Sequence, residues 1–347
     1  PLEDMEFVQF HPTGIHGLGV LISEATRGEG GILRNRTGQR FMEVYAPSLK
    51  DLAPRDVVSR AIWTEIRQGR GVKGEDYVDL DLTHIGPEKI AEKLSDIASF
   101  AKIYLGVDVT KEPIAVTPTC HYMMGGIPTD LDGRVLDRFN RPVPGLYSAG
   151  EAACVSVHGA NRLGTNSLLD LVVFGRRAGR MIARELPELE LNEGMKRPAE
   201  ASKSRIDQLM SRTGGERTFA IRNDLQVMMM DKCSVFRNET DMKKALEELE
   251  SIKQRYKSVC IDNRSMKYNT DLTEAMELEC LIGLAETILK SAITRQESRG
   301  AHFREDYPDR DDKNWLKHTM IQKLGDTTEI FYKPVNISRF QPKARTY

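Results

Sequence analysis

The stretch His158-Gly-Ala-Asn-Arg-Leu-Gly-Thr-Asn-Ser167 sets polar and cationic residues between glycines, directly before a helical pattern from about Asn166 to Arg184. Asn and Ser at the head of a helix accept hydrogen bonds from its first N–H groups, and those groups also attract anions. The stretch therefore predicts an anion or cofactor seat at the start of this helix. Before this stretch, the apolar pattern of 145–150 predicts a strand. A strand followed by a helix indicates a mixed α/β fold.

The composition is that of a folded, water-soluble protein. The chain has 347 residues, 40% of them hydrophobic and 29% charged, which predicts two or three domains with sizeable cores. Fifty Lys and Arg against 51 Asp and Glu leave a net charge of −1, so we expect no attraction to nucleic acid, and any bound anion must be held locally. Five scattered cysteines without a C-x-x-C motif predict neither a disulfide framework nor a zinc site, and they favour a reducing compartment.

Neither a membrane span nor a targeting segment is predicted. The longest apolar stretches, 167–175 and 278–293, are interrupted by charged residues and do not supply the ~20 apolar residues that a span needs. The segment Pro1-Leu-Glu-Asp4 has no initiating Met and no basic or apolar leader. We therefore expect the sequence to begin within a longer protein.

Local patterns divide the chain into an α/β part and a helical part. Short β-like runs such as 20–22 lie between glycines, and helices are predicted over 56–66 and 87–104. Residues 187–203 are rich in Pro, Glu, Asn and Lys, which is typical of a linker.

A helical bundle is predicted beyond this linker. Thr240 or Asp241 is the expected N-cap of one helix, and Asp271 with Glu274 forms a capping box for a helix that includes 276–293. From residue 295 onward, Asp, Arg, Pro and aromatic residues mix, which indicates a small irregular or β-containing tail.

Three groups of segments crowd polar, cationic and glycine residues where a core would need apolar ones. They are 9–14 with 23–31, 54–60, and 118–126 with 150–151 and 158–167. A planar guanidinium binds a carboxylate through two hydrogen bonds, so a small carboxylate anion is the expected guest. Glu24, Arg27 and Arg55 could relay a proton to it. Taken singly, His11 and His121 could instead be structural histidines and Arg55 an exposed helix residue.

Several motifs, in their order along the chain, resemble the flavoprotein subunit of succinate dehydrogenase and fumarate reductase. They are Gln9-Phe-His-Pro-Thr-Gly14, Arg27-Gly-Glu-Gly-Gly31, Arg55-Asp-Val-Val58, Pro118-Thr-Cys-His-Tyr-Met-Met-Gly-Gly-Ile-Pro128, His158-Gly-Ala-Asn-Arg-Leu-Gly164, Asn166-Ser-Leu-Leu-Asp-Leu-Val-Val-Phe-Gly175 and Glu297-Ser-Arg-Gly-Ala-His302. Their spacing matches as well, from residue 5 to at least Thr319.

The resemblance implies an α+β or mixed α/β chain in four parts. These are a capping domain of the fumarate reductase type over 5–123, the returning segment of a Rossmann-like FAD domain over 124–190, a helical domain over 195–298 and a C-terminal domain over 299–347. The family's G-x-G-x-x-G turn and the histidine that carries covalent flavin have no counterpart in this sequence. We therefore expect the carboxy-terminal part of such a flavoprotein, without its FAD-binding half and inactive in isolation.

The resemblance also implies roles for individual residues. His11, Ser23, His121 and Arg162 fall on dicarboxylate-binding positions, Arg55 on the proton-transfer position with Glu24 and Arg27 as its relay, and Glu151, Ser167 and Leu168 on FAD-contacting positions. Many relatives carry Thr where this chain has Ser23, a change that keeps the hydroxyl. The implied reaction transfers a hydride between FAD and one carbon of the succinate and fumarate pair, while Arg55 exchanges a proton at the other carbon.

The implied partners are an iron–sulfur subunit and, through it, a membrane anchor subunit, as in respiratory complex II. The implied location is peripheral, on the cytoplasmic face of the inner membrane or on the matrix side in a mitochondrion. Residues 295–318 combine six basic and six acidic residues with aromatic ones, and part of this segment or the preceding helices is expected to contact the iron–sulfur partner.

Two other readings stay open from the sequence. L-Aspartate oxidase shares the His-Gly-Ala-Asn-Arg and Glu-Ser-Arg-Gly segments. Alternatively, the polypeptide is a catalytically silent fragment that binds only dicarboxylates or partner subunits.

Overall fold

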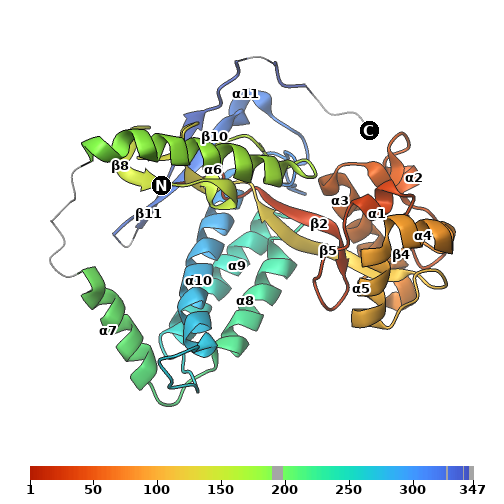
Figure 1. The fold of residues 1–347 in the computed structure, drawn as a ribbon, viewed down its shortest axis with the longest axis horizontal. Coiled ribbons are helices and arrows are strands. Elements are labelled where there is room, and N and C mark those ends of the chain that lie inside the picture. Colours follow the sequence, from red (N-terminus) through yellow and green to blue (C-terminus); the bar gives the residue numbers. More distant parts are fainter. Residues whose placement is uncertain (190–197, 326, 339, 344–347) are drawn as a thin grey trace. The chain divides into compact units, whose positions relative to one another are not determined.

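The computed structural model describes residues 1–189, 198–325, 327–338 and 340–343, and it divides into two compact units. Unit 1 comprises Pro1–Glu6, Gly125–Val157 and Asp170–Pro334, and unit 2 comprises Phe7–Met124, His158–Leu169 and Val335–Tyr347. The expected mixture of helices and sheets is confirmed (Figure 1). The four domain boundaries that the resemblance implies stay a prediction.

Unit 2 is built on a four-stranded antiparallel sheet in the order β2-β5-β4-β3. The strands are β2 (Val8–Ile15), β3 (Ile32–Arg34), β4 (Val78–Asp81) and β5 (Ile114–Met123). The helical segments are α1 (Ala25–Gly28), α2 (Met42–Tyr45), η1 (Lys50–Leu52), α3 (Arg55–Glu65), η2 (Ile66–Arg70), η3 (Val72–Gly74), α4 (Pro87–Lys93) and α5 (Ser95–Leu105). One apolar core joins the sheet to α3, α4 and α5. Helix α3 packs on β2, where the Ser59 hydroxyl donates to the Phe10 carbonyl at 3.1 Å.

Unit 1 combines small sheets with long helices. Its strands are β1 (Leu2–Glu3), β6 (Ile127–Pro128), β7 (Arg134–Leu136), β8 (Pro142–Tyr147), β9 (Ala153–Cys154), β10 (Lys317–Leu324) and β11 (Thr327–Pro334). They form an antiparallel sheet β1-β10-β11, a parallel pair β6-β9 and an antiparallel pair β7-β8. The helical segments are η4 (Gly150–Ala152), η5 (Leu186–Glu188), α7 (Pro198–Ser211), α8 (Thr218–Lys232), α9 (Glu239–Tyr256), α10 (Thr270–Thr294) and α11 (Asp312–Trp315). A second core lies among α8, α9 and α10, which confirms a helical bundle, and α6 (Asn166–Glu185) begins in unit 2 and continues into unit 1.

Two predicted elements of unit 2 are wrong in detail. Residues 20–22 form no strand, because Gly17 and Gly19 adopt positive φ in a tight turn and only Leu21 makes an isolated bridge, to Gly14. The helix predicted over 87–104 is broken at Leu94, whose φ of −131° leaves the helical region, and it continues as α4 and α5.

The predicted helix starts in unit 1 are also wrong. Asn238 caps α9 by accepting from the Asp241 N–H at 2.9 Å, and Asn269 caps α10 by accepting from the Leu272 N–H at 2.9 Å. Asp271 instead accepts from backbone N–H groups of the preceding loop. The predicted linker over 187–203 is helical from 198 to 203, while 190–197 lie outside the described residues.

Buried arginines hold the tail of unit 1 together. Arg295 donates to Glu6 at 2.5 Å and to Glu297 at 3.0 Å, and all three side chains are fully buried. Arg304 is likewise buried and donates to Asp306 at 2.7 Å. Arg295 and Arg304 are therefore used inside the chain, and the predicted contact of part of 295–318 or of the preceding helices with an iron–sulfur partner stays a prediction for other residues.

Candidate active site

All the predicted site residues except Glu151 lie in unit 2, on β2, β5, α3, α1 and the two residues before it, and on the start of α6 and the loop that leads into it (Figure 1). Glu151 belongs to unit 1, where it is exposed in η4. The cationic members of the unit 2 group are Arg27, Arg55 and Arg162, each less than a tenth exposed.

Arg55 occupies the first position of α3, directly after Pro54, whose extended backbone ends the preceding loop. Its Nε donates to Glu24 Oε2 at 2.8 Å and its Nη1 donates to Gln9 Oε1 at 3.1 Å. These two acceptors fix the plane of the guanidinium. Among the described residues Nη2 has no hydrogen-bond partner, so its two N–H groups are available to an anion.

Arg27 contributes a second buried cation. Its Nη1 donates to the Asp51 carbonyl, while its Nε and Nη2 are buried without a partner in the described part of the chain. Burial and the Arg55 charge lower the pKa of Arg27, and the charges of Glu24 and Asp51 oppose this. The Arg27 side chain makes no direct hydrogen bond to Glu24 or Arg55 within the described residues, so the predicted relay is joined only between Glu24 and Arg55.

His121 and Arg162 are in direct contact. Arg162 Nη2 lies 2.8 Å from His121 Nε2, and its guanidinium carbon lies 4.3 Å from the centre of the Tyr122 ring. Because a guanidinium can only donate, His121 Nε2 accepts and its proton is on Nδ1. Burial, with the Arg55 and Arg162 charges, lowers the pKa of His121 to about 4.

His11 lies beside His121, with the ring centres 5.1 Å apart in an edge-to-face arrangement. Its Nδ1 accepts from the Thr13 N–H at 3.3 Å, which puts the proton on Nε2. Burial is the main reason that its pKa falls to about 2, and the charges of Arg55 and His121 add to the effect. Both histidines are therefore neutral near pH 7, and each offers one N–H donor.

Ser23 is exposed just before α1, where its Oγ accepts from the Ala25 N–H at 3.3 Å. The structure shows no hydrogen bond from Ser23 to the histidines or arginines of the site among the residues described. The role of Ser23 therefore stays a prediction from the resemblance.

Sequence reasoning missed three polar residues that connect the arginines. Gln9 Nε2 donates to the Arg162 carbonyl at 2.6 Å and to Asn161 Oδ1 at 2.8 Å. Asn161 Nδ2 in turn donates to Asp56 Oδ1 at 2.9 Å. Gln9, Asn161 and Asp56 all lie inside the motifs quoted above. Their place in these motifs is the one feature of the sequence that could have marked them as site residues, but it does not predict which partners they bind.

Gly164 permits a close approach to the acid of the site. A Cβ added there would lie 2.9 Å from Glu24 Oε2, the oxygen that accepts from Arg55. The missing side chain thus lets the loop before α6 pass directly beside the Glu24 and Arg55 pair.

Ser167 and Leu168 fit a role in holding a cofactor at the start of α6. The Ser167 hydroxyl accepts from Arg162 Nη1 at 3.4 Å, and the Leu168 side chain is 60% exposed. The first turn of α6 contains no acidic residue that would offset the positive end of the helix dipole. Two of its N–H groups, those of Asn166 and Leu168, donate to the carbonyls of Leu163 and Thr165. An open apolar side chain beside such a helix end suits a flat ring system that carries partial negative charge.

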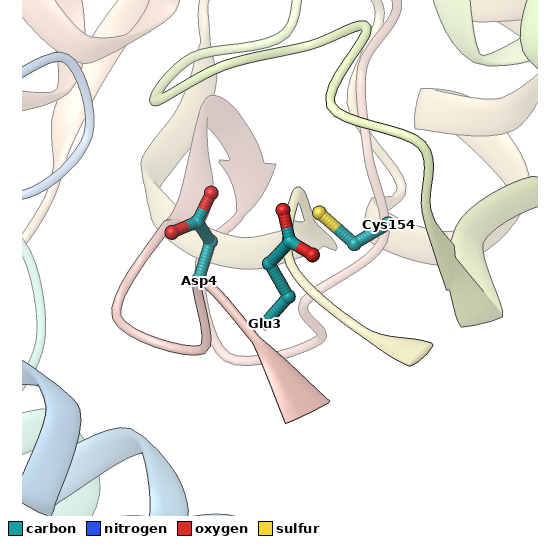
Figure 2. Close-up of side chains that lie close together, drawn as sticks. All are labelled: Glu3, Asp4 and Cys154. Carbon is teal, nitrogen blue, oxygen red and sulfur yellow. The ribbon is translucent and has the colours of Figure 1, made fainter. Parts of the chain in front are cut away.

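A second cluster of titratable groups lies in unit 1, where Glu3, Asp4 and Cys154 place their polar atoms within 4.8 Å of one another (Figure 2). Lys333 Nζ lies 2.6 Å from Glu3, and His318 Nδ1 lies 2.6 Å from Asp4 and 3.1 Å from Glu3. Burial opposes the charge on His318, but the hydrogen bond and charge of Asp4 raise its pKa overall. Since both carboxylates already have cationic partners, we read the cluster as part of the packing of unit 1.

The chain is similar to known flavoproteins along most of its length. The family described as FAD binding domain matches residues 1–168, and the family described as fumarate reductase flavoprotein C-term matches residues 222–347. The mitochondrial succinate dehydrogenase flavoprotein subunit of rice is 48% identical over all of this chain and 57% of its own length. The corresponding subunit of Rickettsia bellii is 48% identical over 99% of this chain and 59% of its own.

Solved structures agree with these matches. Quinol fumarate reductase FrdA of Escherichia coli superimposes with a TM-score of 0.91 at 41% identity, over 99% of this chain and 61% of its own. This chain belongs to the family of succinate dehydrogenase and fumarate reductase flavoprotein subunits. It spans about 60% of the length of these relatives, and the family is one that uses FAD.

The family assignment confirms the resemblance seen in the sequence and favours it over L-aspartate oxidase. No described helix is both long and apolar enough to cross a membrane. The roles of individual site residues stay predictions. The contacts described above give most of them a defined partner or a defined unpaired donor to test.

Proposed function

We propose that the protein to which this chain belongs interconverts succinate and fumarate with FAD, and that the substrate sits among Arg55, Arg162, His11 and His121. The observation that carries the proposal is a buried group of cations and neutral imidazole donors around Arg55, which has unpartnered N–H groups. A doubly charged, flat dicarboxylate matches such a set of donors.

The two histidines and Arg162 would hold the carboxylates. His11 Nε2 and His121 Nδ1 are the free donors of their rings, and Arg162 adds a planar cation 2.8 Å from His121. Because the histidines are neutral, they polarise a carboxylate by hydrogen bonding and cannot neutralise it by giving up a proton. Ser23 has a free hydroxyl on the same unit and would bind the same ligand.

Arg55 would exchange the proton at the carbon that does not exchange hydride. Guanidinium groups have a pKa above about 12, so Arg55 can give up a proton only if a neighbour returns it at once. Glu24 Oε2, 2.8 Å from Arg55 Nε, is placed to do so. Arg27 would extend the path through its two unpartnered nitrogens, Nε and Nη2, by way of a bridging water.

FAD supplies hydride transfer when bound, and Ser167, Leu168 and Glu151 are the residues of this chain proposed to hold it. The proposed partners follow from the family: an iron–sulfur subunit that takes the electrons and a membrane anchor subunit reached through it. The exposed part of 295–318 would contribute to the iron–sulfur contact, and the location would be peripheral at the membrane that holds the anchor.

The test compares Arg55→Lys with wild type in the flavin-loaded protein, with succinate, fumarate and L-aspartate as substrates. Lysine keeps the charge but loses the planar fork, so kcat should fall by more than ~100-fold while the affinity for malonate, an unreactive dicarboxylate, changes much less. Arg36→Lys, at an exposed arginine of the same unit, is the matched control. A proportional loss of affinity and kcat would make Arg55 a binding residue only, and turnover of L-aspartate without succinate or fumarate would overturn the proposal.

A further inference from the structure

A continuous line of hydrogen bonds runs from a buried carboxylate to the proposed proton donor. It starts at Asp56, which is 5% exposed, passes through Asn161 at 2.9 Å and Gln9 at 2.8 Å, and ends at Arg55 Nη1 at 3.1 Å. We propose that Asp56 is a positioning residue that orients Arg55 through the amides of Asn161 and Gln9. The catalytic consequence of this role rests on the proposed function above.

The two ends of an amide have similar size but opposite polarity, and this polarity gives the line its direction. The Asp56 carboxylate can only accept, so Asn161 must turn its NH2 group toward it. The Asn161 carbonyl oxygen then faces Gln9, which must present its own NH2 group. The Gln9 carbonyl oxygen is thereby left to face Arg55, whose guanidinium can only donate.

Gln9 also fixes the distance between the two substrate-facing arginines. Its NH2 group donates both to Asn161 and to the main-chain carbonyl of Arg162, while its carbonyl oxygen accepts from Arg55. Gln9 is fully buried, so no solvent molecule competes for these bonds at the side chain. If the Gln9 amide were reversed, its NH2 group would face the Arg55 guanidinium, which is also a donor. Its oxygen would face Asn161 Oδ1 and the Arg162 carbonyl, which are both acceptors.

Asp56 determines the orientation of the Asn161 and Gln9 amides, because an ionised carboxylate has no donor and can only accept. If position 56 carried an amide, that amide could present either end to Asn161, and the orientation of the whole line would no longer be determined. The Arg162 carbonyl would still favour one orientation of Gln9, so the effect should be partial. Small misplacements of a reacting group can cost up to ~100-fold in rate, and we expect about tenfold here.

The experiment exchanges the carboxylate and the amide. Asp56→Asn should lower kcat for fumarate reduction about tenfold, with the KM for fumarate and the dissociation constant of malonate within about threefold of wild type. Combining it with Asn161→Asp moves the carboxylate one step along the line, where it accepts both from position 56 and from Gln9. The double variant should regain kcat to within about threefold of wild type.

Two further variants separate positioning from stability. Gln9→Met keeps the size but removes the amide, and it should lower kcat at least as much as Asp56→Asn. Arg60→Gln removes the cation that lies 3.1 Å from the other carboxylate oxygen, Asp56 Oδ2, but its amide can still donate there. It can lower stability, and it should leave kcat within about threefold of wild type. The solvent deuterium isotope effect on kcat should rise in Asp56→Asn and Gln9→Met, because proton transfer becomes slower relative to the other steps.

The outcomes are distinct from those for the proposed function. If wild type turns over neither dicarboxylate, the proposed function fails. The positioning role of Asp56 is overturned if wild type is active and Asp56→Asn keeps the wild-type kcat. It is also overturned if kcat of the double variant, Asp56→Asn with Asn161→Asp, is no higher than kcat of Asp56→Asn alone. An equal loss of kcat and malonate affinity, together with a lower melting temperature, would also overturn it by making Asp56 a purely structural residue.

Discussion

The buried guanidinium of Arg295 should contribute several kcal/mol to the stability of unit 1. Its five N–H groups donate five hydrogen bonds, to the side chains of Glu6, Glu297 and Thr319 and to the carbonyls of Trp315 and Lys317. Arg295→Met would leave all five acceptors without that donor. Among the described residues the Glu6 carboxylate then has no cation in direct contact, and its Oε2 already lacks a hydrogen-bond partner. Arg237 would still donate to the Glu6 main-chain carbonyl at 2.6 Å.

Removing one partner of a buried ion pair typically costs about 3–5 kcal/mol. We therefore expect Arg295→Met to lower the free energy of unfolding of unit 1 by this amount. For a domain of this size, ~1 kcal/mol corresponds to about 2–4 °C in melting temperature, so the transition should fall by roughly 6–20 °C. Scanning calorimetry and urea unfolding, followed by tryptophan fluorescence, measure both quantities.

Arg217→Met is the matched control, because Arg217 pairs with Asp262 while the two side chains are 56% and 68% exposed. Exposed pairs contribute at most ~1 kcal/mol, so this variant should be nearly neutral. Arg295→Lys, with three donors in place of five, should lie between wild type and Arg295→Met. If Arg295→Met lowers the free energy of unfolding no more than Arg217→Met does, the buried hydrogen bonds of Arg295 do not stabilise unit 1 as expected.

Three further outcomes are expected. Gly164→Ala should push Glu24 away from Arg55 and lower kcat about tenfold; a full-activity variant, assayed with fumarate, would show that Glu24 can move without cost. Because the pKa of His121 is lowered to about 4 in the folded state, the unfolded state binds its proton first. The free energy of unfolding should thus fall as the pH drops from about 6.5 toward 4, and His121→Gln should weaken this dependence in urea titrations. The pKa of His318 is raised in the folded state, so its effect on the pH dependence of the free energy of unfolding has the opposite sign. Its contribution should be complete below pH 6.5 and be lost as the pH rises through the folded-state pKa, and a His318→Gln variant with an unchanged pH profile of unfolding would contradict this.

The sequence predicted which motifs carry the site, but not how their side chains meet. His11 and His121 lie on strands β2 and β5, whose pairing shifts register after Gln9 and again before Gly14. A regular ladder would alternate faces along each strand, whereas these irregularities bring the two rings to 5.1 Å. No one-dimensional pattern encodes such shifts.

Long-range hydrogen bonds were unpredictable for a related reason. Gln9 and Asn161 are 152 positions apart, and Asn161 and Asp56 are 105 apart. Residue type alone permits many partners for an amide, and only the folded chain selects one. Local competition explains the misplaced helix caps, since Asn238 and Asn269 stand beside other good capping residues and differ little from them in intrinsic preference.

The pairing of β1 with β10 sets the order in which unit 1 can be completed during synthesis. Glu6 emerges from the ribosome 289 residues before Arg295, and Asp4 emerges 314 residues before His318. At about 5–20 residues per second, these carboxylates wait roughly 15–60 s for their cations. During that interval the carboxylates of Asp4 and Glu6 must stay hydrated, although the Glu3 backbone can already pair with Gly126 and Phe7–Met124 is available to fold. Nascent chains arrested before residue 295 should therefore leave Leu2–Glu3 more accessible to proteases and chaperones than chains in which residue 334 has already left the ribosome.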